Sequence, residues 1–241
     1  IIFTGKASKP SYVSIFDSTI EIKDASKIWG KGGRETLRYL VNKEWKQDVS
    51  KPYPTKGVWK DPSVLYIGPA GESLCRMAAV MHKWTHAAGY GGYGAVMGSK
   101  MLKAVVAKGC GPLPKCADFK QVMKVMKKVC KQCFEAEVFR HWGTAIAGYD
   151  TGYRLSSEPI RNWQEEWHAA KEYAVIEFDE RTWVKRYWGD YNCPTTCLKI
   201  SVLKSGPFKG YISDAPDYEL QAYLGTNLGI FAPEDNVYLS A

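Results

Sequence analysis

Apolar and polar residues alternate along the opening segment of the chain, which is the pattern of β-strands. Side chains of residues 12–16 fall on alternating sides, and Ile20 and Ile22 continue the pattern after Asp17 and Ser18. The sequence therefore predicts a β-hairpin that turns at Asp17 and Ser18.

Shorter elements are expected in the rest of the first half. The pattern predicts a helix over 36–45 and a buried strand over 63–67. Residues 89–98 are rich in glycine and are expected to form a turn that leads into a strand over 101–109.

The pattern becomes helical after residue 112. Asp118 is a plausible N-cap, and apolar residues recur at helical spacing from Phe119 to about residue 139. Strands first and helices later indicate an α+β fold, with a β-rich domain over 1–111 and a mainly helical domain over 112–241. Further helices are expected over 162–173, 180–188 and 218–224, with a loop over 201–213.

Composition adds few constraints. The chain has 241 residues, of which 45% are hydrophobic, so it can bury a core. No apolar run reaches the roughly 18 to 20 residues of a membrane span, and the start lacks signal-peptide features. We expect a soluble protein without a membrane partner, and both ends of the sequence are interpreted as cuts within a longer chain.

The net charge of +8 raises the question of a nucleic-acid partner. The lysines are scattered, and the densest run, Lys120 to Lys131, lies opposite an apolar helical face. A solvated surface is therefore favoured, and no nucleic-acid partner is expected.

Seven cysteines include two close pairs, Cys130/Cys133 and Cys193/Cys197. Such spacing suits metal or redox chemistry better than a secreted disulfide framework, so a reducing cytoplasm is expected. Cys130 and Cys133 fall on the apolar helical stripe, where core packing is favoured over zinc binding. A CxxxC turn such as Cys193 to Cys197 can place two sulfurs on adjacent irons of a cluster, although buried thiols remain an alternative.

Glycines are dense in GPAGE (Gly68 to Glu72) and in the segment from Ala87 to Ala104. Bare backbone there can line an anionic ligand, and Lys100 and Lys103 could supply charge. The segment does not match the phosphate-loop pattern GxxxxGK[ST], and a glycine-rich loop taken alone is weak evidence for a ligand. A tight structural turn is therefore an equal alternative at this point.

These segments resemble the aldehyde:ferredoxin oxidoreductase family. The similarity extends over nearly the whole chain, in the family's order and spacing. It is carried by Lys9 to Lys31, Ile67 to Met81, Ala87 to Val105, Gly143 to Ala145, Pro159 to Gln164, Asn192 to Cys197 and Pro216 to Ile230.

The resemblance implies a tungsten or molybdenum ion held by two pterins, whose phosphates bridge Mg²⁺, and a nearby 4Fe-4S cluster. It also implies a β-sheet base that carries the pterins. Pterin contact is carried over onto a short glycine-rich group, but Tyr90 stands where the family has an arginine. The group consists of Gly91, Gly92, Gly94 and Ala95.

The family's cluster motif is CxxCxxxC, and Asp190 here occupies the place of its first cysteine. Cys193 and Cys197 are expected ligands. For Asp190, an oxygen ligand and an altered or lost cluster both remain open. Glu219 matches a family glutamate beside the metal, where a buried carboxylate could accept a proton, although a helix-start role is the alternative.

The resemblance implies oxidation of aldehydes to carboxylic acids, with electrons passed to ferredoxin or an electron-transfer subunit. An aromatic acyl-CoA reductase and a cofactor-free subunit or binding module are the alternatives. An oligomer is expected. His141 is the histidine nearest an expected cavity, the other histidines are expected to be structural or at the surface, and Asn162 and Trp163 could line a substrate channel.

Overall fold

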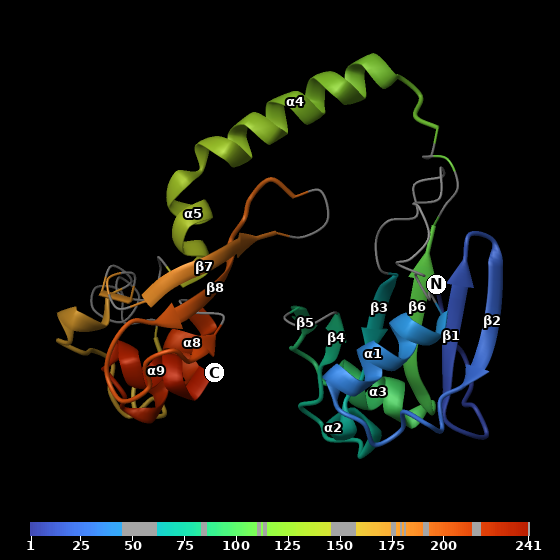
Figure 1. Cartoon of the computed structure of the whole chain (residues 1–241), viewed down its shortest axis with the longest axis horizontal. Helices are drawn as coiled ribbons and strands as arrows, with labels where there is room; N and C mark the ends of the chain where they lie inside the picture. The colour runs from blue at the N-terminus through green and yellow to red at the C-terminus, as the bar shows by residue number, and fades with distance from the viewer. Residues whose placement is uncertain are drawn as a thin grey trace. The chain divides into compact units, whose positions relative to one another are not determined.

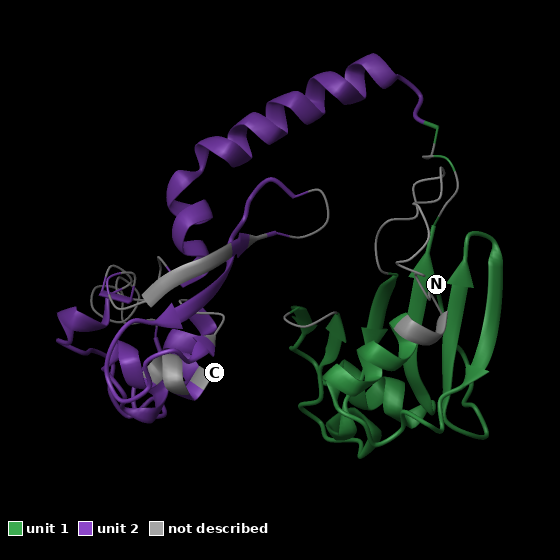
Figure 2. Ribbon diagram, viewed as in Figure 1, with its two compact units in different colours: residues 1–115 green, residues 116–241 purple. Residues whose placement is uncertain are grey.

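The computed structural model divides into two compact units, residues 1–115 and 116–241 (Figure 2). Each unit is described by itself. The structure describes residues 1–44, 62–82, 86–109, 112, 115–145, 158–174, 177, 178, 180, 182–189, 193–213 and 218–240.

Unit 1 is built on a six-stranded mixed sheet with strand order β2-β1-β6-β3-β4-β5 (Figure 1). Strands β1 and β6 are parallel, and every other neighbouring pair is antiparallel. The elements are β1 (Ser11–Phe16), β2 (Thr19–Asp24), α1 (Gly33–Glu44), β3 (Ser63–Tyr66), α2 (Pro69–Glu72), β4 (Val80–His82), β5 (His86–Ala88), α3 (Tyr93–Ser99) and β6 (Leu102–Lys108).

The expected hairpin is confirmed, because β1 pairs with β2 and the turn contains Asp17, whose φ is 50°. Helix α1 packs on the sheet through Leu37 and Leu40, which join a core cluster with residues such as Tyr12 and Val64. The turn expected over 89–98 is only partly correct, because Tyr93–Ser99 forms helix α3 before β6 begins.

Unit 2 combines helices with a three-stranded antiparallel sheet of order β7-β8-β9, which the sequence did not predict. Its small core gathers Tyr173, Phe178 and Leu203. The elements are α4 (Phe119–Glu135), α5 (Glu137–Trp142), η1 (Gly143–Ala145), η2 (Lys171–Tyr173), β7 (Thr182–Trp188), β8 (Leu198–Leu203), β9 (Ile212–Ser213), α8 (Tyr218–Tyr223), η3 (Thr226–Leu228) and α9 (Pro233–Ser240).

Helix α4 begins as predicted, because the Asp118 side chain accepts a hydrogen bond from the Gln121 amide at 3.0 Å. None of its residues is buried, and Cys130 and Cys133 are only half-buried. The prediction that these two side chains pack in a core is therefore wrong among the described residues. Among those residues, no helix is long and apolar enough to cross a membrane.

Two predicted helices of unit 2 are wrong. Residues 182–188 form strand β7, because their β-branched and aromatic residues pair with β8, whose side chains alternate between half-buried and buried. Residues 161–163 have φ values of 44°, 58° and 63°, which a right-handed helix excludes. The predicted loop over 201–213 contains part of β8 and β9. The α+β class itself is confirmed.

Candidate functional site

The glycine turn of unit 1 lies at the start of α3. Gly91 and Gly92 have φ values of 94° and 68°, which glycine adopts without strain. A Cβ on Gly92 would overlap the carbonyl oxygen of Arg76. A Cβ on Gly94 would come within 2.6 Å of the Ala79 carbonyl oxygen, and the Gly94 amide donates a 2.8 Å hydrogen bond to the Ala78 carbonyl. Gly92 and Gly94 are therefore required for the close approach of this turn to the segment 76–79.

The outer part of this turn is open. Gly89 and Gly91 are exposed, a Cβ on Gly89 would meet nothing within 4 Å, and Tyr90 is 94% exposed. Ala95 is half-buried, and its amide donates to the Gly92 carbonyl at 3.1 Å. A flat ligand that approaches this turn would meet accessible backbone and a phenol ring. The turn is therefore compatible with a pterin contact of that kind, and Tyr90 stands where the resembled family has a positively charged arginine.

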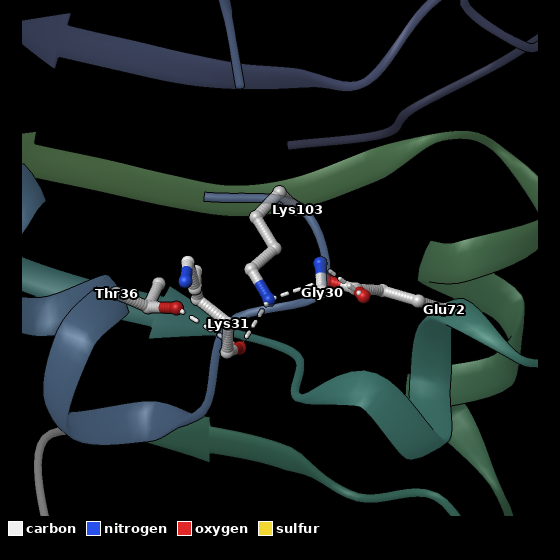
Figure 3. A network of polar contacts seen from close by, with 5 residues as sticks. All are labelled: Gly30, Lys31, Thr36, Glu72 and Lys103. Atoms are coloured by element: carbon white, nitrogen blue, oxygen red, sulfur yellow. Dashed lines mark hydrogen bonds and ion pairs between the residues drawn. The ribbon is translucent and has the colours of Figure 1, made fainter. Parts of the chain in front are cut away.

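We expected Lys103 to offer positive charge to a ligand near this turn, and this expectation is wrong. Its side chain is fully buried and forms an ion pair with Glu72 of GPAGE (Figure 3). Lys100 is close in sequence, but its Nζ donates to the Gly5 carbonyl at 3.1 Å. The sequence analysis did not predict the Lys103–Glu72 pair. The available signal was a lysine within the apolar strand LKAVVA, because a buried lysine needs a partner.

The cysteine loop of unit 2, residues 193–197, leads into β8. A Cβ on Gly189 would come within 2.9 Å of the Thr195 carbonyl oxygen and 3.1 Å of the Cys193 carbonyl oxygen, so the loop folds tightly over this glycine. The Cys193 thiol is exposed and lies 3.6 Å from the Thr195 carbonyl oxygen, while Cys197 is half-buried. Asp190 lies outside the described residues.

Two neighbours hold Cys197 in place. Buried Lys199 donates to the Cys197 carbonyl at 2.9 Å. Gly143, with a φ of 62°, packs so closely that a Cβ would come within 2.6 Å of the same oxygen. The segment Gly143–Ala145 is therefore fixed against the cysteine loop, and only glycine suits its first position.

The same segment contacts the helix that carries Glu219. The Tyr218 amide, at the start of α8, donates to Thr144 Oγ1 at 3.5 Å. Glu219 occupies the first turn of α8, where it is exposed. Unit 2 thus brings the cysteine loop, the segment Gly143–Ala145 and the start of α8 together, through a backbone contact at Gly143 and a hydrogen bond to the Thr144 side chain. The burial expected around Glu219 is not provided by the described residues.

An open hollow of about 620 Å³ lies beside the cysteine loop. His141 lines it, as expected for the histidine nearest a cavity, and its Nδ1 lies 3.2 Å from the Tyr187 hydroxyl. Thr196, between the two cysteines, also lines it. The other described residues that line it are Glu137, Val138, Arg140, Trp142 and Tyr187.

A buried polar pair in unit 2 was also missed by the sequence. His168 Nε2 lies 3.3 Å from Glu158 Oε2, and both side chains are almost fully buried. Burial, reinforced by the Glu158 carboxylate, raises the pKa of Tyr173 well above its usual range. No sequence spacing signals this pair. Trp163, expected near a substrate channel, is exposed on the left-handed turn over 161–163.

Among the described residues, no group of three or more histidine, cysteine or acidic side chains forms a complete metal site. The cysteine loop offers two thiols on one turn, which suits partial ligation of an iron–sulfur cluster. Other ligands would have to come from residues outside those described.

The two units match two family models in succession. Residues 1–109 match "Aldehyde ferredoxin oxidoreductase, N-terminal domain", and residues 120–241 match "Aldehyde ferredoxin oxidoreductase, domains 2 & 3". Both units thus belong to one family of α+β proteins that are assembled from successive domains. The chain belongs to the aldehyde ferredoxin oxidoreductase family.

Curated relatives belong to the same family and are longer than this chain. An "Aliphatic sulfonate oxidoreductase, WOR-like subunit" from Pyrococcus furiosus is 56% identical over 100% of this chain and 38% of that protein. A "Tungsten-containing aldehyde ferredoxin oxidoreductase" from Pyrococcus abyssi is 36% identical over 95% of this chain and 35% of that protein. The chain therefore spans little more than a third of the curated relatives that it matches.

A solved structure shares the fold. The BamBC active-site complex of benzoyl coenzyme A reductase, bound to 1,5-dienoyl-CoA, superposes with a TM-score of 0.65 at 20% identity. The match covers 98% of this chain and 35% of that chain. At this identity, the likeness establishes the fold alone.

Proposed function

We propose that this chain is the cofactor-binding part of a longer tungsten- or molybdenum-pterin oxidoreductase. The observation that carries the proposal is the contact series in unit 2, which joins Cys197 through Gly143 and Thr144 to the start of α8, where Glu219 lies. Cys197 matches a cluster ligand of the family, and Glu219 matches its glutamate beside the metal. The segment Gly143–Ala145 contacts both the cysteine loop and the start of α8. When bound, the metal–pterin group supplies the two-electron redox chemistry, and the chain positions it and its substrate.

The glycine turn of unit 1 would contact a pterin. Gly91 and Ala95 present accessible or half-accessible backbone, while Gly92 and Gly94 fix its position by packing against the segment 76–79. The Gly94 amide already donates to Ala78, so it would contribute shape and not a phosphate hydrogen bond. The pterin phosphates, and the Mg²⁺ that the resemblance implies, would need other partners, because Tyr90 has no positive charge.

Cys193 and Cys197 would hold two irons of a 4Fe-4S cluster. Their shared tight turn, fixed by Gly189 and Lys199, keeps the two sulfurs on one loop. Asp190 would supply a third, oxygen ligand, and a further ligand would come from the longer protein. Held by these residues, such a cluster would supply one-electron transfer, for which ferredoxin or an electron-transfer subunit is the proposed acceptor.

Glu219 would act as a general base. For an aldehyde, the balanced reaction is RCHO + H₂O → RCOOH + 2H⁺ + 2e⁻, so one group near the substrate must accept a proton from the attacking water. Glu219 is exposed within this chain, so its carboxylate is accessible to such a water.

The substrate is proposed to be a small aliphatic compound. The relative that is 56% identical over the whole chain is named for aliphatic sulfonates, whereas those named for aldehydes are 32–36% identical. This difference favours a sulfonate and keeps an aldehyde as the second candidate. An acyl-CoA substrate is supported by fold alone.

The test is anaerobic purification of the longer protein, followed by assays with aliphatic sulfonates, aliphatic aldehydes and an aromatic acyl-CoA. A one-electron dye and ferredoxin serve as acceptors for the oxidations, and a reduced dye serves as the donor for the acyl-CoA. Sulfonate-dependent dye reduction supports the proposal, and turnover of aldehydes alone would establish the second candidate. A protein that contains no tungsten, molybdenum or iron would be the cofactor-free module, and the proposal would fail.

A further inference from the structure

Gly30, Lys31, Thr36, Glu72 and Lys103 form a network of polar contacts in unit 1 (Figure 3). Lys103 belongs to β6, its side chain is 0% exposed, and its ammonium pairs with the carboxylate of Glu72, which is 6% exposed. Lys103 Nζ also donates to the Lys31 carbonyl at 3.0 Å. A buried ammonium thus has a charged partner and a neutral acceptor.

The network joins three segments that are distant in sequence. The second oxygen of Glu72 accepts a 2.6 Å hydrogen bond from the Gly30 amide. Thr36 Oγ1, in the first turn of α1, donates to the Lys31 carbonyl at 3.3 Å. The turn before α1, the end of α2 and strand β6 are therefore fixed to one another.

Helix α2 in turn determines where α3 lies. A Cβ on Gly71 would come within 2.9 Å of the Gly94 carbonyl oxygen, and a Cβ on Gly98 would overlap the Gly71 carbonyl oxygen. The two helices are in direct backbone contact at these glycines. Because backbone contacts leave little room to adjust, a shift of α2 must move α3 or separate the pair.

We propose that Lys103 and Glu72 are positioning residues that hold α2, and through it α3, so that the turn from Gly89 to Gly92 has the shape that receives a pterin. This inference rests on the proposed function for the identity of the ligand. The positional part rests on contacts within unit 1 alone.

Electrostatics explain why both members are needed. Burial lowers the pKa of Lys103, and the Glu72 carboxylate opposes this effect. Removal of one partner leaves a charge without compensation in the interior, whereas replacement of both with neutral groups removes that penalty. If the pair only stabilised unit 1, breaking it would lower the stability of the whole unit. It would then not loosen α2 and α3 more than the rest of the unit.

The test uses the longer protein with Glu72→Gln, Lys103→Met and the double variant K103M/E72Q. Gln keeps an acceptor for the Gly30 amide, and Met keeps most of the lysine volume. Lys27→Met is the control, because Lys27 is exposed and has no polar partner among the described residues. Tungsten or molybdenum per chain, iron per chain and amide hydrogen exchange are measured for each.

Each single variant should lower bound tungsten or molybdenum on the order of tenfold, as loss of supporting contacts around metal sites typically does. Exchange at 69–72 and 89–99 should accelerate about tenfold, while exchange in β8 and the iron content stay unchanged. The double variant should recover most of both losses, and the control should match the parent protein.

The proposal is overturned if single variants keep their metal content and exchange rates. It is also overturned if both units lose protection together and the double variant does not recover. Hydrogen exchange needs no cofactor, so a metal-free parent protein would contradict the proposed function while the positional inference is still tested by exchange.

Discussion

Gly98 of α3 lies so close to Gly71 of α2 that a Cβ at position 98 would overlap the Gly71 carbonyl oxygen. Alanine is normally the better helix former, by up to about 1 kcal/mol. Here that preference is reversed, because the contact partner is backbone and cannot rotate away. The glycine-rich sequence is thus explained in part by helix packing within unit 1.

We predict that Gly98→Ala destabilises the protein by about 1–3 kcal/mol, the usual cost of overpacking. Gly32→Ala is the matched control, since a Cβ there meets nothing within 4 Å and its φ is not in the left-handed region. Denaturant unfolding of the two variants checks the prediction. Equal midpoints for Gly98→Ala and Gly32→Ala would contradict it.

Tyr173 should make stability depend on alkaline pH. Its pKa is raised from the ordinary 10.0, first by burial and then by Glu158, so the folded state retains the phenolic proton when the unfolded state has lost it. The stabilisation is complete below pH 10 and is lost as pH rises further, by up to about 1.4 kcal/mol per pH unit.

The measurement compares unfolding of the parent protein and Tyr173→Phe at pH 8 and pH 11. At pH 8 the variant should be less stable by about 1 kcal/mol, because it lacks the 2.8 Å hydrogen bond to the Gln221 carbonyl. At pH 11 the difference should shrink or reverse. Parallel losses of stability in both proteins would show that Tyr173 does not titrate in this way.

Cys193→Ser and Cys197→Ser should each remove most of the iron from the longer protein and reduce its visible absorption. The reason is that serine oxygen is a poor substitute for a thiolate on an iron–sulfur cluster. Cys75→Ser and Cys116→Ser are controls, since both thiols are exposed and lie away from the cysteine loop in sequence. Iron content that is unaffected by changes at Cys193 and Cys197 would exclude the proposed ligands.

Glu219→Gln should lower turnover by roughly 10²- to 10⁴-fold, the range for loss of a general base. Metal content and stability should stay close to those of the parent, because an exposed surface substitution typically changes stability by less than about 0.5 kcal/mol. Glu172→Gln, at another exposed glutamate, should keep full turnover. A Glu219→Gln protein with normal turnover would assign this residue to the helix start alone.

Local patterns were predictable where one local interaction dominates. The strand pattern over 12–16 identified β1, and the Asp118 cap with helical spacing identified α4. The prediction failed over 182–188, where pairing with β8 determines the structure, and over 161–163, where the Arg161 and Asn162 amides donate to Thr226 and Asn227. Those partners lie far along the sequence, so no local periodicity encodes them.

The candidate site divides in the same way. Residue types and spacing point to Cys193, Cys197 and the glycine turn as candidates, because short motifs can be read from sequence alone; their roles remain predictions. The pairing of Lys103 with Glu72 links positions 31 residues apart, and the contact of Gly143 with Cys197 requires a folded unit. Such contacts depend on tertiary structure. In the sequence they leave only a lysine within an apolar segment, or a glycine, with no evident local reason.

The most direct test of the account is metal analysis of the longer protein, purified without oxygen, together with electron paramagnetic resonance of the reduced form. The account predicts tungsten or molybdenum and iron at about one to four, with a reduced iron–sulfur signal that is lost in Cys197→Ser. A well-folded protein that contains none of these metals and shows no such signal would contradict it.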